Sequence, residues 1–279
     1  MITLQNKLYE SLLDDEDDLV NDSTVLIEQF LKDNYEINGS YAIKNGIVNI
    51  NGSIQLSDKG RLELTELTND MFEFGTVSGN FACSACKNLI SLKGAPKKVE
   101  GSFICGYCKK LKSLEGAPKV VGKIFSCSND NITSLKGISE KVTEINCSYC
   151  DKLKSLEGAP RKIKTFDCSD CINLKDLTGA PKEIEEDFTC NNCINLQSLK
   201  GGPEKVGRFF NCSGCDNLKE LTGAPREVGG FDCTDCSSLT SLEEMPELIK
   251  GDFTGYRCYN LKRGSRDIAN QRTKGRVSM

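Results

Sequence analysis

Sixteen cysteines are the residues of this sequence best suited to chemistry. All but Cys127 and Cys258 stand in C-x-x-C pairs, such as Cys105 and Cys108, which recur every 20 to 22 residues. Two neighbouring pairs offer four thiolates, a ligand set that zinc prefers. Cysteines in adjacent strands, about 4.8 Å apart, could also form disulfides. A third possibility is that the thiols simply pack, because a buried cysteine behaves as a small apolar residue.

The serial arrangement of these pairs favours a structural role. In a long series each pair belongs equally to two neighbours, so no four cysteines form a distinct set. Asp130 replaces the second Cys of one copy, and Gly255 replaces the first Cys of the last copy. We therefore expect no metal and no other cofactor. We expect the second Cys of each pair to bond to backbone groups that the sheet leaves unpaired. A zinc-binding C-x-x-C array remains an alternative function.

The composition argues against enzymatic activity. The chain contains no histidine, which excludes Ser-His-Asp and Cys-His catalysis and removes the imidazole that metals bind most often. No P-loop and no nucleophile motif is present, and the carboxylates are spread along the chain rather than paired. We expect a non-enzymatic protein with no catalytic residues.

The cysteines belong to a longer repeat, F-x-C-x-x-C-x-x-L-x-x-L-x-G-A-P, after which come two variable residues and then a Val or Ile. Copies begin at Phe81, Phe103, Phe125, Ile145, Phe166, Phe188, Phe210, Phe231 and Phe253. A repeat of fixed period predicts a solenoid in which each coil stacks on the next. Phe103 and Cys105 are two residues apart and so lie on the same side of a strand. Leu111, Leu114 and Val121 complete the inward set of that coil.

The run from Phe103 to Leu114 resembles the leucine-rich repeat L-x-L-x-x-N/C-x-x-L in its cysteine-containing form. The resemblance covers about residues 48–261, with Phe in place of the first Leu of the strand. The L-x-G-A-P-x-x-V phrase and the acidic start are similar to leucine-rich-repeat proteins encoded by large tailed phages. The resemblance implies a curved array with one parallel β-sheet on its concave side and a mostly irregular convex side. It also implies that the concave face binds protein.

The chain divides into four segments that differ in pattern and charge. They are an acidic arm with a short helix (1–36), a degenerate capping coil (37–78), an array of about nine coils (79–261) and a basic tail (262–279). The tail is nearly free of apolar residues, so it is either disordered or bound along an acidic surface.

The two N-terminal segments are predicted in more detail. Ser23 and Thr24 can cap a short helix that ends at Asn34. The capping coil alternates apolar and polar residues, which predicts short strands with turns at Asn45-Gly46 and Asn51-Gly52.

The outward positions vary from coil to coil, so any binding function lies there. Residues 165–256 carry 8 basic and 17 acidic side chains (net −9), whereas residues 257–279 carry 7 and 1 (net +6). Tyrosine is favoured at protein interfaces. The candidate partner-binding residues are Ile104, Tyr107, Asn129, Tyr149, Asp167, Asp170, Asp187, Asp232, Asp235 and Arg257.

These observations predict a protein–protein interaction module or scaffold whose partner is a basic or polar protein segment. Self-association through the basic C-terminal tail is one form of this hypothesis. A structural component of a phage virion is an alternative. We expect no nucleic-acid binding, because the lysine-rich coils lack interleaved exposed aromatic residues. No signal peptide and no run of about 18 apolar residues is visible, so we expect a cytoplasmic protein without membrane contact.

Overall fold

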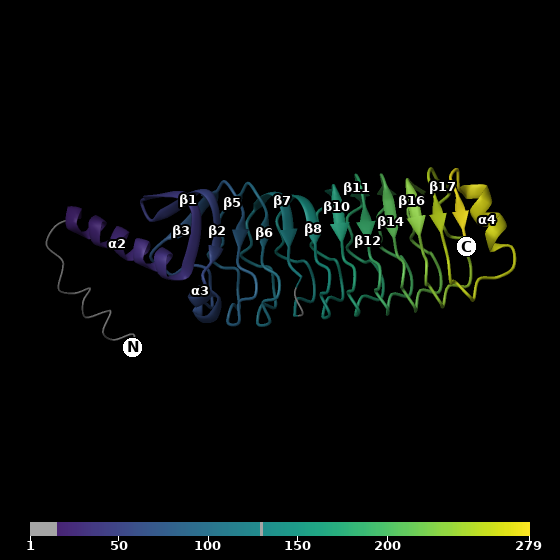
Figure 1. Cartoon of the computed structure of the whole chain (residues 1–279), viewed down its shortest axis with the longest axis horizontal. Helices are drawn as coiled ribbons and strands as arrows, with labels where there is room; N and C mark the ends of the chain where they lie inside the picture. Colours follow the sequence, from purple (N-terminus) through teal and green to yellow (C-terminus); the bar gives the residue numbers. More distant parts are fainter. Residues whose placement is uncertain (1–15, 129–130) are drawn as a thin grey trace.

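The computed structural model describes residues 16–128 and 131–279, which form a parallel β-solenoid. Its coils are stacked along one long axis, with the N-terminal helix at one end and the C-terminal helix at the other (Figure 1). The predicted repeat solenoid with a parallel sheet and a helical N-terminal region is therefore confirmed. None of the helices in these described ranges combines the length and the apolar character that crossing a bilayer would require.

Most strands belong to one fourteen-stranded sheet, which we call the long sheet. Its strands are β1 (Tyr35–Lys44), β2 (Ile47–Leu56), β3 (Glu73–Val77), β4 (Phe81–Ala82), β5 (Lys98–Val99), β6 (Phe103–Ile104), β7 (Val120–Ser126), β8 (Lys141–Asn146), β10 (Thr165–Asp167), β12 (Phe188–Thr189), β14 (Phe209–Asn211), β16 (Gly230–Asp232), β18 (Phe253–Thr254) and β19 (Val277–Ser278). Strands β1 and β2 pair antiparallel, and the other neighbours pair parallel.

The repeated Phe and Cys positions build the core behind the long sheet. Phe103, Cys105, Cys108, Leu111 and Leu114 are all 0% exposed, as the repeat predicts. Phenylalanines of successive coils are paired in register with ring centroids 5.1 to 6.2 Å apart; five of these pairs are stacked, Phe103 and Phe125 are tilted by 37°, and Ile145 interrupts the series. This regular stacking sets the register of the coils, because a shift of one residue would turn the rings outward.

The structure adds a second parallel sheet to the one predicted. Its five strands, the short sheet, are β9 (Lys162–Ile163), β11 (Glu183–Ile184), β13 (Lys205–Val206), β15 (Glu227–Val228) and β17 (Leu248–Ile249). They form at the Val or Ile that follows each Pro, because these side chains are buried and stack directly on one another. The rest of each described coil, from the second Cys to the Pro, contains turns, as predicted.

The glycine of the G-A-P phrase makes the tight turn of most coils. Gly116 has φ +88°, and a Cβ there would lie 2.7 Å from the carbonyl carbon of Leu92 in the preceding coil. Only glycine combines a left-handed backbone with so close an approach. The turn glycine is therefore required by stacking as well as by conformation.

The N-terminal region differs from the prediction in two places. Helix α2 spans Glu16–Asn34, so Ser23 and Thr24 lie inside it rather than at its start, while Asn34 ends it as predicted. No Gly or Pro interrupts residues 16–34, and the helix continues through the predicted cap.

The hairpin that follows α2 joins β1 to β2. The turn predicted at Asn45-Gly46 is present, with φ of 51° and 69°. The turn predicted at Asn51-Gly52 is wrong, because β2 runs straight through it with Gly52 opposite Gly39. A Cβ on Gly39 would lie 2.2 Å from the carbonyl oxygen of Asn51, so these glycines permit a close approach of the two strands.

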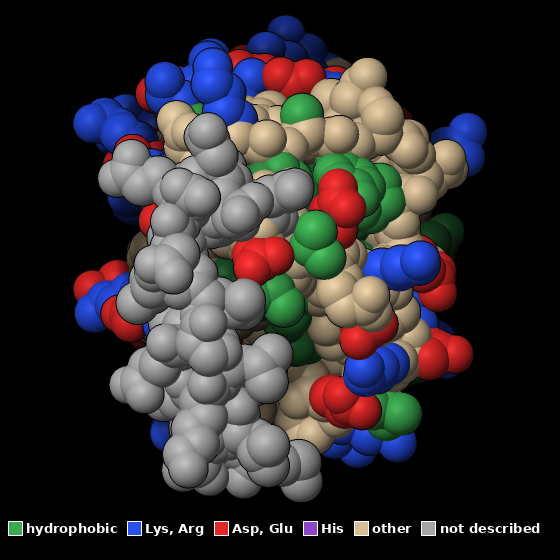
Figure 2. All heavy atoms as spheres, turned by 90° about the vertical axis from the view of Figure 1, so that its left-hand side faces the viewer, with side chains coloured by type: hydrophobic (Ala, Val, Ile, Leu, Met, Phe, Trp, Pro, Cys, Tyr) green, Lys and Arg blue, Asp and Glu red, His purple; other side chains and the backbone are tan. Residues whose placement is uncertain are grey.

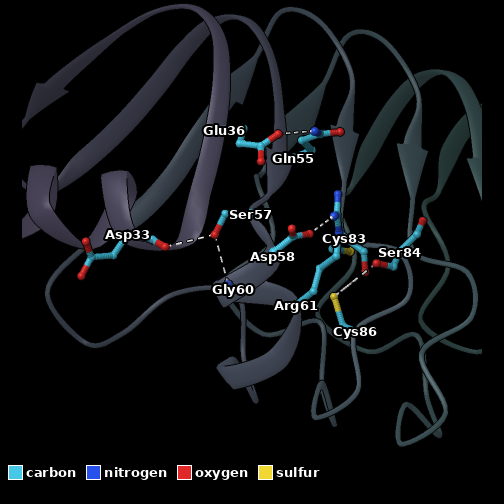
Figure 3. Close-up of polar contacts among 10 residues, drawn as sticks. All are labelled: Asp33, Glu36, Gln55, Ser57, Asp58, Gly60, Arg61, Cys83, Ser84 and Cys86. Atoms are coloured by element: carbon cyan, nitrogen blue, oxygen red, sulfur yellow. Dashed lines mark hydrogen bonds and ion pairs between the residues drawn. The ribbon is translucent and has the colours of Figure 1, made fainter.

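Helix α3 (Asp58–Glu63) links the hairpin to the first coils. The hydroxyl of Ser57 accepts from the backbone N–H of Gly60 at 3.1 Å and donates to the carbonyl of Asp33 at 3.0 Å (Figure 3). This N-cap ties the start of α3 to the end of α2.

The basic C-terminal segment is folded against the last coil. It forms helix α4 (Ser265–Arg272) and β19, and β19 pairs parallel with β18. Thr273 bridges to Ile249, and one guanidinium nitrogen of Arg272 donates to the carbonyls of Glu243 and Met245, both at 2.8 Å. Residues 264–279 thus close both sheets at this end, which is the capping role that a solenoid requires.

Candidate partner-binding face

The thiol of the second Cys in a coil donates to the carbonyl of the first Cys one coil earlier. Cys108 Sγ lies 3.2 Å from the carbonyl oxygen of Cys83, and Cys150 Sγ lies 3.3 Å from that of Cys127. The same contact joins Cys171 to Cys147, Cys193 to Cys168, Cys215 to Cys190, Cys236 to Cys212 and Cys258 to Cys233, at 3.0 to 3.3 Å. The expected bond from the second Cys to an unpaired backbone group is present in these coils.

The ladder starts at the first coil that contains cysteines, which begins at Phe81. Cys86 donates to Cys83 of its own coil at 2.9 Å and lies 3.6 Å from the carbonyl oxygen of Ser84 (Figure 3). No cysteine stands at the corresponding place in the preceding segment. The ladder therefore begins where the cysteine repeat begins.

The sixteen cysteines are all buried and are present as thiols. Burial raises the pKa of Cys83, Cys105 and Cys168 well above the usual value, because a thiolate would lose its hydration there. Across residues 16–128 and 131–279, no three His, Cys, Asp or Glu side chains are grouped so as to hold a metal ion. The observed geometry supports the packing role of these cysteines.

A second ladder, made by asparagines directly before the first Leu position of the repeat, was not predicted. Asn173 Nδ2 donates to the carbonyl of Asp151 at 2.5 Å, and Asn260 Nδ2 donates to that of Ser237 at 2.8 Å. Asn88, Asn131 and Asn195 make the equivalent contact with the preceding coil or segment. The recurrence of Asn at one position of the repeat was the signal that could have revealed it.

The predicted site residues fall on the open face of the long sheet. The strand row consists of residues between the Phe and the first Cys, and it holds Ile104, Asp167 and Asp232. The turn row consists of residues directly before the second Cys, and it holds Tyr107, Tyr149, Asp170, Asp235 and Arg257. Asp187 directly precedes Phe188 of β12, and Asn129 lies outside the described residues.

Acidic residues of the strand row cap their own turns. Asp167 accepts hydrogen bonds from the backbone N–H and hydroxyl of Ser169 at 2.9 and 2.5 Å. Asp232 accepts from the N–H of Thr234 at 2.8 Å. Asn146 makes the same bond with Ser148, so the position favours Asp or Asn for local turn formation.

Other predicted acidic residues are paired along the stack. Asp235 lies 3.2 Å from Arg257, and Asp170 accepts from Asn192 at 3.2 Å. Asp187 lies 3.7 Å from Arg208. The acidic residues share one face, as predicted, but their carboxylates already interact within the chain.

The tyrosines of the turn row stand out from their neighbours. Tyr107 and Tyr149 are 65% and 56% exposed, with φ of 61° and 59°. The described turn row is left-handed throughout, and the other residues there are Ala85, Asp170, Asn192, Gly214, Asp235 and Arg257. Gly, Asn and Asp suit this conformation, whereas a bulky side chain makes it costly. The left-handed backbone was not predicted from the sequence.

The coils that carry and separate these tyrosines also present apolar side chains on their strands, and one of these side chains lines a depression. Ile124, which is 37% exposed, precedes Phe125 at the end of β7, and Ile104 lies between Phe103 and Cys105. Ile104 also lines a shallow depression of about 420 Å³ with Ile37, Ile54 and Ala82 of the neighbouring strands. We call Ile104, Tyr107, Ile124 and Tyr149 the tyrosine patch.

Comparisons of the chain with protein-family models, with curated proteins and with solved structures found no match. The resemblance to leucine-rich repeats therefore rests on the repeat pattern alone.

Proposed function

We propose that this protein is a non-enzymatic interaction module that binds a protein partner through the open face of the long sheet. The tyrosine patch is the anchor of that interaction. The observation that carries the proposal is the left-handed backbone at two exposed tyrosines, Tyr107 and Tyr149.

The energetic argument compares tyrosine with the other residues of the turn row. A left-handed backbone costs an L-residue other than glycine about 1–2 kcal/mol. Both side chains point mainly into solvent, so packing within the chain does little to offset that cost. Gly214 shows that the coil can place glycine at the same position. Tyrosine supplies a large, rigid contact surface in protein interfaces, and binding gives a reason for its presence here.

The acidic half of the face would serve as the rim of this interface. Asp170, Asp187 and Asp235 are partly exposed, and each is already paired on one side. Exposed pairs of this kind contribute little stability, so a basic or polar segment could still exchange with them. Such charges mainly orient the partner and accelerate its encounter.

The test is a quantitative crosslinking pull-down with full-length bait. The double variant Tyr107→Asn/Tyr149→Asn keeps a residue that suits the left-handed turn. Tyr259→Asn removes a tyrosine that is 79% exposed and lies beyond the second Cys, so it is the matched control. We expect partners captured by the wild type and the control to be lost from the double variant, whose melting temperature should equal or exceed that of the wild type. Equal capture by all three baits would refute the proposal.

A further inference from the structure

The two ends of the solenoid differ in how their last strands are covered. At the C-terminal end, α4 and β19 close both sheets. At the N-terminal end, β1 pairs with β2 over ten residues, from Tyr35 opposite Leu56 to Lys44 opposite Ile47. No second strand pairs with β1 in the part of the chain that the structure describes. An unpaired strand edge of this length is a template for pairing with another chain.

The turn determines which backbone groups of β1 are open. Lys44 and Ile47 flank a two-residue turn, so they exchange hydrogen bonds with each other. Because hydrogen-bonded and non-hydrogen-bonded pairs alternate along an antiparallel ladder, the backbone N–H and C=O groups of the even-numbered residues of β1 point toward β2. The N–H and C=O groups of the odd-numbered residues, including Ile37, Tyr41 and Ile43, point away from β2.

The side chains of this end are only half covered. Ile37 and Ile43 pack against the core on one side and are partly exposed, and Tyr41 is 41% exposed. Helix α2 buries Ile27 and Leu31 but extends away from the stack beyond its junction with β1 (Figure 1). Seen from this end, apolar side chains lie in the middle of the described surface among uncharged polar groups, backbone and a few acidic side chains, with lysines and arginines mostly toward its rim (Figure 2).

The sequence of β1 is complementary to itself when two copies run antiparallel. With Ser40 on a two-fold axis, Glu36 faces Lys44 of the second copy, and Ile37 faces Ile43 of the second copy. Both pairs occur twice. Glu36 and Lys44 are exposed, and Gln55 donates to the Glu36 carboxylate on the open side of the sheet (Figure 3).

This register pairs odd-numbered residues with odd-numbered residues, which are the ones whose backbone N–H and C=O groups are open. Ile37 and Ile43 are odd-numbered, so they would form the hydrogen-bonded pairs across the new edge. Glu36 and Lys44 would occupy non-hydrogen-bonded pairs, in which side chains approach most closely. Two-fold registers centred on Gly39 or Tyr41 do not bring these two charges together.

We propose that the β1 edge is a self-association surface and that its occupant is β1 of a second copy of this chain. Two solenoids then join end to end about a two-fold axis, and the long sheet continues across the junction. This contact is isologous, so it closes at the dimer. Ile37 of this edge lines the same shallow depression as Ile104 of the tyrosine patch, but the pairing of β1 does not depend on the function proposed for that patch.

The test measures the mass of the full chain by light scattering and sedimentation over a range of concentrations. We expect a dimer whose dissociation constant rises about tenfold in Glu36→Lys and in Lys44→Glu, because each places like charges opposite each other twice. The double variant Glu36→Lys/Lys44→Glu should regain the wild-type dissociation constant. If Glu36→Lys weakened the dimer only because it removes the hydrogen bond from Gln55, adding Lys44→Glu would not restore the dissociation constant.

A backbone variant gives an independent readout. Tyr41→Pro removes an outward N–H without removing a bond to β2, and we expect it to be monomeric with circular dichroism like that of the wild type. A wild-type chain that stays monomeric, or a dimer that neither single charge variant weakens, would overturn the proposal. So would failure of the charge-swapped double variant to restore the dimer.

Discussion

Cys108 Sγ lies 3.2 Å from the carbonyl oxygen of Cys83, so the thiol of one coil donates to the backbone of the coil before it. Both residues are 0% exposed. A buried carbonyl without a donor is costly, and the second Cys of the repeat supplies that donor. The C-x-x-C pair therefore serves two purposes, because one sulfur fills the core and the other joins successive coils.

The contact predicts how substitutions at Cys108 rank. Cys108→Ala removes this donor but leaves the Cys86 thiol 2.9 Å from the same carbonyl, so it should lower the free energy of unfolding by about 0.5–1.5 kcal/mol. Cys108→Ser keeps a donor of similar size and should recover part of that loss. Urea unfolding followed by circular dichroism measures both. Equal stability of Cys108→Ala and the wild type would show that the contact contributes nothing.

The buried thiols predict a loss of stability at alkaline pH. Burial holds the pKa of Cys83, Cys105 and Cys168 well above the usual value, whereas the same thiols in the unfolded chain ionise near pH 8.5. Below that pH both states keep their protons. Above it the unfolded state loses protons that the folded state retains, so stability falls as pH rises, by about 1.4 kcal/mol per pH unit for each such thiol.

The measurement is the urea midpoint at pH 7, 8.5 and 10, under reducing conditions. We expect little change between the first two values and a steep fall to the third. Thiol titration with an aromatic disulfide reagent should give almost no reaction with the folded protein and sixteen thiols after denaturation. A flat midpoint across this range, or rapid reaction of the folded protein, would contradict the burial of these groups.

The turn glycines allow a matched pair of substitutions. Gly116 and Gly264 have similar left-handed φ values, +88° and +93°. A Cβ at Gly116 would lie 2.7 Å from the backbone of Leu92, whereas a Cβ at Gly264 would have nothing within 4 Å. Gly264→Ala should cost only the conformational strain, about 1–2 kcal/mol. Gly116→Ala should cost clearly more, because neighbouring coils must also separate.

Thermal and urea unfolding of the two variants separates these contributions. The difference between Gly116→Ala and Gly264→Ala reports the packing of one coil on the next. Identical stabilities would mean that the coils are loose enough at this turn to accept a methyl group.

Much of the fold could be predicted because the repeat is a local pattern. The spacing of Phe103 and Cys105 places both side chains on one face of a strand, whatever surrounds them. The turn at Asn45-Gly46 was likewise predictable, since two-residue hairpins favour Asn-Gly. Asn51-Gly52 has the same residue types but lies inside β2, opposite Gly39, because pairing with β1 outweighs the local preference.

The candidate site was predicted less completely. Its outward positions were identified correctly as a face, but Asp167 and Asp232 cap their own turns, and Asp235 is paired with Arg257. These contacts depend on the path of the backbone within a turn and on which side chain the next coil places alongside. Neither is encoded by residue type alone.

The sequence by itself determined the period of the coil, its inward residues and the turns at Gly and Pro, because each depends on residues that are near neighbours in the chain. Only the tertiary structure decided that Cys108 meets Cys83, that a short sheet forms beside the long one, and that the basic tail closes the stack. These features arise from hydrogen bonds between coils, so they exist only once stacking has set which coil lies against which. The same is true of the open edge of β1, which depends on which strands find partners.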